Sequence, residues 1–211
     1  DLIIDLRYNG GGDLSVAQQL ASLVMGPADT TKICYKLNYN STVSAEWNET
    51  YKFTKTTNPL GLNRTVFITT RSTASASEVV INSLRPYVSV SLVGDTTYGK
   101  PVGMNVWAFP FPTTRVPNPD YKYVFLPITF EFVNASNEGG FYDGIVPDVL
   151  ANDDITRDFG DPQELSLKAA IAVLEGTKAG SAVPLRRNII RNEGEHLPAD
   201  LIVRSPKLLT K

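Results

Sequence analysis

Residues 1–25, DLIIDLRYNGGGDLSVAQQLASLVM, join a short apolar run, three consecutive glycines and a segment with helical spacing. The run from Leu2 to Arg7 predicts a buried strand, because strands covered on both faces are almost continuously apolar. The glycines break this strand, and Asp13 is a suitable N-cap for a helix over residues 14–25. A strand, a glycine turn and a helix in this order predict an α/β fold.

The same pattern recurs along the chain. Apolar runs at 66–69 and 88–93 predict two more buried strands, and a helix is expected between them, from the TASASE segment at 73–78 to about Leu84. Pro86 would end that helix. The predicted fold class is therefore α/β, with a mixed sheet flanked by helices.

Other segments complete this outline. Residues 32–57 alternate polar and apolar side chains and predict strands or a surface hairpin, and residues 123–133 resemble a strand. Residues 108–120 contain four prolines, which predict a loop. Asp161-Pro162-Gln163-Glu164 supplies an N-cap, a first-turn proline and a capping acid for a helix that ends at Gly176.

The composition narrows the possible functions. The 211 residues are 42% hydrophobic and 20% charged, as in an ordinary soluble domain, and no signal peptide or transmembrane run is apparent. The net charge of −2 leaves no basic excess to bind a phosphate backbone, which argues against a nucleic-acid partner. One cysteine, Cys34, and one histidine, His196, exclude a disulfide framework and multi-histidine or multi-cysteine metal sites. No cofactor or metal is expected, and Cys34 lies in an apolar stretch that predicts a buried structural thiol.

The single histidine also limits nucleophilic catalysis. A Ser-His-Asp or Cys-His site would have to use His196, which lies in a polar segment near the C-terminus. Lysine is the natural substitute, because a desolvated ammonium group can lose its proton near neutral pH. Lys100, between Gly99 and Pro101, is the candidate, although an isolated loop lysine is usually a solvated residue.

Ser75 is the candidate nucleophile. With Glu78 three residues later it forms a capping-box pattern, which by itself indicates an ordinary helix start. The same position places the serine beside free backbone N–H groups, including that of Ala76, that could stabilise an oxyanion. Ser77 is expected to be a helix-packing residue.

The glycines at 10–12 allow several interpretations. They do not match the dinucleotide fingerprint or the P-loop pattern, since no lysine followed by serine or threonine comes after them. A plain tight turn is one alternative. An oxyanion hole is another, because glycine lets the backbone approach a substrate carbonyl closely.

Four segments together resemble the C-terminal processing, or tail-specific, peptidases. They are DLRYNGGG at 5–12, TASASE at 73–78, VGDTTYGK at 93–100 and GIVPD at 144–148, and the resemblance spans residues 1–176. It implies a Clp protease/crotonase-like fold and a serine endopeptidase that cuts proteins near their C-termini with a Ser-Lys pair. By motif, Ser75 is the nucleophile and Lys100 the general base, with oxyanion amides from Ala76 and Gly12, or alternatively Gly11.

The chain departs from the family pattern in two places. Met104 stands where many members have a glutamine that orients the lysine, and Pro86 falls where some have an aspartate. Asp95 and Glu78 are possible substitutes. The departures leave open a peptide-binding relative without catalysis, and the glycine turn leaves open a crotonase-like acyl-CoA enzyme.

The resemblance also predicts the organisation and location of the protein. The chain begins in an apparent core strand, so we expect an N-terminally truncated catalytic core over residues 1–176, followed by a tail or extended arm over 177–211. Family members usually carry a peptide-binding PDZ domain upstream and work outside the cytoplasm, which predicts a periplasmic or secreted protein.

Overall fold

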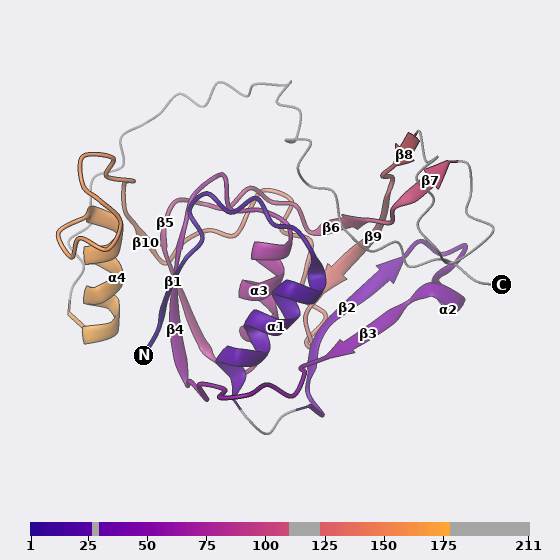
Figure 1. Cartoon of the computed structure of the whole chain (residues 1–211), viewed down its shortest axis with the longest axis horizontal. Helices are drawn as coiled ribbons and strands as arrows, with labels where there is room; N and C mark the ends of the chain where they lie inside the picture. Colours follow the sequence, from indigo (N-terminus) through magenta and orange to yellow (C-terminus); the bar gives the residue numbers. More distant parts are fainter. Residues whose placement is uncertain (27–29, 110–122, 178–211) are drawn as a thin grey trace.

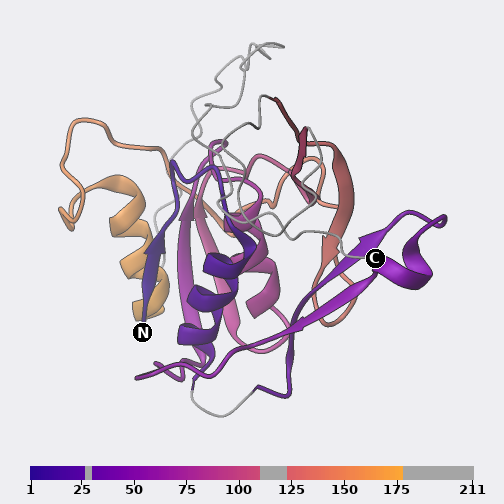
Figure 2. The same cartoon turned by 45° about the vertical axis from the view of Figure 1, so that its right-hand side comes forward.

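The computed structural model describes residues 1–26, 30–109 and 123–177. Its elements form four layers (Figures 1 and 2): helix α4 (Leu165–Glu175), a parallel sheet, the helix pair α1 (Leu14–Met25) and α3 (Ala76–Leu84), and an antiparallel sheet. Helices thus cover both faces of the parallel sheet. None of the helices in the described ranges is long and apolar enough to cross a membrane.

The parallel sheet brings three of the sequence motifs to one end of its strands. Its strands are β1 (Ile3–Asp5), β4 (Arg64–Thr69), β5 (Ser89–Gly94) and β10 (Val149–Leu150), paired in the order β1-β4-β5-β10. Because the strands are parallel, their carboxyl ends meet on one side. The glycine turn after β1, the TASASE segment after β4 and the loop after β5 are therefore brought together.

The second sheet is antiparallel. It contains β2 (Ile33–Tyr39), β3 (Glu49–Lys52), β6 (Val102–Met104) and β9 (Ile128–Val133), in the order β3-β2-β9-β6. The short helix α2 (Ser44–Trp47) joins β2 to β3, and β7 (Trp107–Phe109) pairs with β8 (Tyr123–Phe125) in a separate ribbon. Parallel and antiparallel pairings thus occupy different sheets.

Two apolar clusters hold the layers together, and β4 contributes to both. Phe67 points to the main core, which α1 and α3 fill between the two sheets. Val66 and Ile68 point the other way, to Ala170 of α4. This alternation is the two-residue period of a strand buried on both faces.

Most predicted elements are confirmed, including the bounds of α1 and its Asp13 cap, whose side chain accepts from Ser15 N–H. The N-cap of α4 was predicted wrongly. Glu164, not Asp161, caps the helix, and its carboxylate accepts from the N–H groups of Ser166 and Leu167 at 3.1 and 2.8 Å. The predicted helix end at Gly176 is confirmed by a left-handed residue with φ of 68°.

Two other predictions were incomplete. The single strand expected over 123–133 is divided into β8 and β9, with Pro127, which has no N–H to donate, between them. The strands β6 and β7 were not predicted. The tail from 178 onwards, with His196, and most of the proline-rich loop lie outside the described residues.

Candidate active site

Ser75 lies at the junction between β4 and α3, one residue before the helix begins. Its φ of 56° and ψ of −118° are unusual for a residue with a side chain, and such backbone strain costs about 1–3 kcal/mol. Its neighbours hold it there, since Ala74 N–H donates to Asn9 O at 3.1 Å and Ser75 N–H donates to Glu78 Oε2 at 2.7 Å. The half-buried serine is thus fixed at the start of α3, as the motif predicts.

Glu78 connects Ser75 to Lys100. The fully buried carboxylate accepts from Ser75 N–H and Lys100 N–H with the same oxygen, Oε2, at 2.7 and 2.9 Å. Its Oε1 accepts from Thr97 Oγ1 at 2.6 Å and from Gly99 N–H at 2.8 Å. One side chain therefore binds the main chain of the candidate nucleophile and that of the candidate base.

The Lys100 side chain is half-buried. Burial lowers the pKa of its amine below the usual lysine value, and the charge of Glu78 opposes part of this shift. Within the described part of the chain, Nζ forms no hydrogen bond or ion pair. A lowered pKa favours the neutral amine, the form that can accept a proton.

The two proposed substitutes for the missing glutamine differ in their surroundings. Asp95 is exposed, and its carboxylate accepts from Thr96 N–H at 2.7 Å. Glu78 instead fixes the Lys100 main chain. Met104 is the last residue of β6, where it pairs with Ile128, and its thioether is at most a weak acceptor.

The glycine turn packs against Ser75. Gly11 has a φ of +102°, and a Cβ on it would lie 2.8 Å from both Ala76 N and Ser75 Cβ, and 2.7 Å from Ala74 O. Glycine is therefore required for this approach. No described atom lies within 4 Å of a Cβ built on Gly12.

The N–H groups near Ser75 differ in their bonding. Gly11 N–H donates to Asn9 Oδ1 at 2.9 Å. Gly12 N–H and Ala76 N–H donate to none of the described residues. The last two are therefore available to a ligand beside Ser75.

Sequence reasoning missed the contribution of Asn9 and Thr97. Ser77, expected only to pack, is buried and also donates from Oγ to Asn9 Oδ1 at 2.8 Å. Thr97 Oγ1 donates to Glu78 and accepts from Ile145 N–H at 2.7 Å. Both residues stand inside the quoted motifs, but nothing in the pattern indicates their partners.

An ion cluster lies on the other side of β1. Buried Arg7 contacts Asp5 at 2.7 Å and Asp153 and Glu164 at 3.0 Å each. Burial alone would lower the pKa of the Arg7 guanidinium, but its hydrogen bonds and charge attraction to these carboxylates raise it above the usual value. The cluster thereby fastens the segment before α4 to the end of β1.

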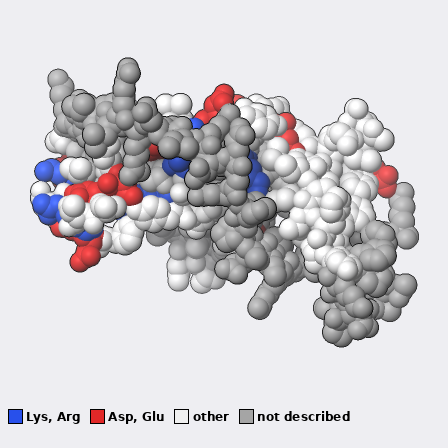
Figure 3. Space-filling model, turned by 90° about the horizontal axis from the view of Figure 1, so that it is seen from above, with Lys and Arg blue, Asp and Glu red and all other residues white. Residues whose placement is uncertain are grey.

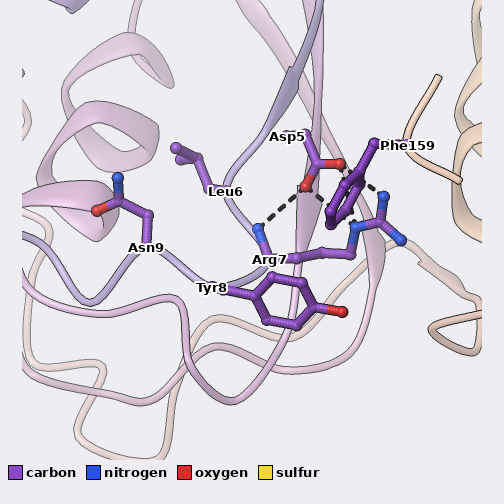
Figure 4. Close-up of a pocket in the computed structure, with 6 residues that line it drawn as sticks. All are labelled: Asp5, Leu6, Arg7, Tyr8, Asn9 and Phe159. Atoms are coloured by element: carbon purple, nitrogen blue, oxygen red, sulfur yellow. Dashed lines mark hydrogen bonds and ion pairs between the residues drawn. The ribbon is translucent and has the colours of Figure 1, made fainter. Parts of the chain in front are cut away.

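A hollow of about 430 Å³ opens beside this cluster. Figure 4 shows the Asp5 carboxylate, the Phe159 ring and the Arg7 guanidinium grouped together, with Tyr8 beneath them and the Asn9 side chain on the other side of Leu6. Arg7 lies 5.0 Å from the centre of the Phe159 ring, a cation–π contact. The charged groups of the hollow are thus already paired.

Other site chemistries find little support in the described residues. No group of three or more histidine, cysteine or acidic side chains in the described ranges could hold a metal ion. Cys34 is fully buried, which raises the pKa of its thiol to about 12, so the predicted structural thiol is confirmed. On the face seen in Figure 3, the basic and acidic side chains of the described residues are interspersed at one end, and those visible there form no continuous basic surface.

Comparison with known proteins identifies sequences and structures similar to this chain. The sequence model of peptidase family S41 matches residues 1–150. Among solved structures, a candidate S41 protease from Bacteroides fragilis NCTC 9343 is 28% identical, with a TM-score of 0.70 over 82% of this chain and 44% of its own.

Two more distant structures share the fold. The photosystem II D1 C-terminal processing protease is 20% identical, with a TM-score of 0.51 over 71% of this chain and 34% of its own. A lipoprotein from Streptococcus agalactiae is 19% identical, with a TM-score of 0.54 over 82% and 54%. The chain therefore spans 34–54% of the length of these three structures.

Proposed function

The chain belongs to peptidase family S41, and we propose that it forms the catalytic core of a serine endopeptidase with Ser75 as nucleophile and Lys100 as general base. The main observation that supports this proposal is the buried Glu78 carboxylate, which accepts hydrogen bonds from the N–H groups of both residues with one oxygen. A shared acceptor keeps the two main-chain segments together. The lowered pKa of Lys100 adds a base that is neutral at a lower pH than an ordinary lysine.

The proposed reaction has two stages. Ser75 Oγ attacks the carbonyl carbon of the scissile peptide while the neutral Lys100 amine takes the hydroxyl proton. Ala76 N–H and Gly12 N–H, which have no partner among the described residues, donate to the oxyanion. Lys100 then passes its proton to the leaving amine, and an acyl-enzyme on Ser75 remains. In the second stage Lys100 activates a water molecule that releases the acyl product.

The proposed substrates are proteins cut near their C-termini, outside the cytoplasm. Support comes from the motifs at 73–78 and 93–100, and from the likeness to a protease named for C-terminal processing. Peptides that differ in their distance from the cut to a free carboxylate would test this preference. Equal cleavage rates at all of these distances would contradict a preference for C-terminal sites.

Cleavage of peptides by the full-length protein tests the mechanism. Ser75→Ala and Lys100→Ala should each abolish cleavage while the fold is retained. Matched controls are Ser72→Ala and Lys168→Ala, which alter exposed residues and should leave the rate unchanged. Wild-type rates in both site variants would show that the assignment is wrong.

A peptide-binding relative without catalysis is the alternative, favoured by Met104 where a glutamine would support the lysine. A fluorophosphonate probe distinguishes the two, because it reacts covalently with an activated serine. Labelling that maps to Ser75 supports the enzyme. Tight peptide binding without labelling or cleavage supports the alternative.

A further inference from the structure

Asn9 connects the glycine turn to the start of α3 on both sides of Ser75. Its Oδ1 accepts from Gly11 N–H at 2.9 Å and from Ser77 Oγ at 2.8 Å. Its main-chain oxygen accepts from Ala74 N–H at 3.1 Å and also lies 3.1 Å from Ser77 Oγ. In the described structure, every hydrogen bond between residues 9–12 and residues 74–78 has Asn9 as its acceptor.

These bonds bear on the two free N–H groups beside Ser75. Ala76 N–H belongs to α3, whereas Gly12 N–H belongs to the turn. The distance between these two N–H groups therefore depends on the position of the turn relative to the helix. Gly11 approaches so closely that an added Cβ would lie 2.8 Å from Ala76 N. A small shift of the turn would therefore change the spacing of the two donors.

We propose that Asn9 is a positioning residue that sets this spacing for the oxyanion. By accepting from Gly11 N–H it leaves Gly12 N–H for the substrate oxygen, and through Ser77 it holds the turn against α3. Donors stabilise an oxyanion most when they are held in place before the reaction. This inference rests on the proposed function.

An amide suits this position better than a carboxylate. Aspartate could accept the same two hydrogen bonds, but it would place a negative charge close to the developing oxyanion. Asn9→Asp therefore separates geometry from charge. It should fold like the wild type, keep KM and lower kcat.

The test compares steady-state kinetics with the affinity of a peptide boronate, which forms a tetrahedral adduct with an active serine. Asn9→Ala should lower kcat by about 10²–10³-fold, the usual effect of losing one oxyanion donor. Boronate affinity should fall in parallel, while KM stays near the wild-type value. If Asn9 only supported the fold, its loss would not lower boronate affinity while leaving KM unchanged.

Two further variants sharpen the comparison. Ser77→Ala should lower kcat by about tenfold, in line with one lost hydrogen bond. Adding it to Asn9→Ala should cause less than a further tenfold loss, because Asn9→Ala has already removed the bond from Ser77 Oγ to Asn9 Oδ1 and leaves only the contact with the Asn9 main-chain oxygen. Asn40→Ala is the matched control. Asn40 Oδ1 accepts from Thr42 N–H at 3.1 Å in a similar turn between β2 and β3, and the change should leave kcat and boronate affinity unaltered.

The outcomes separate this inference from the proposed function. If the wild type cleaves peptides and binds the boronate, but Asn9→Ala matches it in both, the inference is overturned and the proposed function stands. If the wild type does neither, both are overturned. If Asn9→Ala does not fold, Asn9→Asp decides, since a wild-type kcat overturns the inference and a lower kcat at unchanged KM supports it.

Discussion

Replacing Glu78 by glutamine should destabilise the fold and the site together. The buried carboxylate accepts from four donors, namely the N–H groups of Ser75, Gly99 and Lys100 and the Thr97 hydroxyl. Glutamine has the same shape but offers one acceptor oxygen and an NH₂ group that would face donors. At least two donors would then lose their partner.

The magnitude follows from that count. A buried donor without a partner costs about 1–3 kcal/mol, so Glu78→Gln should lower the free energy of unfolding by about 2–6 kcal/mol. This is a large share of the roughly 5–15 kcal/mol that stabilises a typical domain. The folded fraction should also cleave peptides more slowly, because Ser75 and Lys100 no longer share an acceptor.

Urea denaturation, followed by the fluorescence of Trp47 and Trp107, measures the change. Glu175→Gln is the control, because Glu175 is exposed at the end of α4, and it should alter the free energy of unfolding by less than about 0.5 kcal/mol. The reasoning is refuted if Glu78→Gln unfolds within that same margin of the wild type and retains its cleavage rate.

Three more predictions follow from the same structure. Burial lowers the pKa of Lys100, so kcat/KM should rise with pH and level off below pH 10.5. Stability should also rise with pH between the lowered pKa and 10.5, where the unfolded chain binds more protons. A pH–rate profile with its inflection at the ordinary lysine pKa would contradict the lowered pKa of Lys100. Lys100→Met should abolish cleavage without loss of stability. Gly11→Ala should lower kcat/KM at least about 100-fold, because the alanine Cβ would collide with Ser75 and Ala76. A wild-type rate in this variant would contradict the close packing of Gly11 against Ser75. Arg7→Met should lower the free energy of unfolding by about 3–5 kcal/mol, since it leaves the buried Glu164 carboxylate without its cation. The exposed pair of Arg64 with Asp1 provides the control, as Arg64→Met should cost about 0–1 kcal/mol. Equal effects of the two substitutions in urea denaturation would contradict this distinction.

The sequence predicts the elements whose signals are local. Helix α1 has regular apolar spacing and Asp13 before it, so its bounds follow from neighbouring residues. The strands β6 and β7 have three residues each and no alternating run long enough to detect. Glu164 and Asp161 are both acids near a helix start, and only the structure shows that Glu164 accepts from the first N–H groups of α4 while Asp161 accepts from Gln163 N–H.

The sequence names candidate site residues but not the contacts between them. The motifs point to Ser75 and Lys100, and the capping box pairs Glu78 with Ser75. That Glu78 also accepts from Lys100, 22 residues away, depends on how the chain folds back after β5. The contact of Arg7 with Asp153, separated by 146 residues, is equally invisible in a local pattern.

The central claim is that Lys100 activates Ser75. Its most direct test is mass-spectrometric mapping of the acyl-enzyme formed from a peptide ester by the full-length protein. The account predicts that the acyl group is on Ser75 in the wild type and is absent in Lys100→Met, which should keep the wild-type stability. An acyl group on another residue, or equal acylation of Ser75 in both proteins, would contradict it.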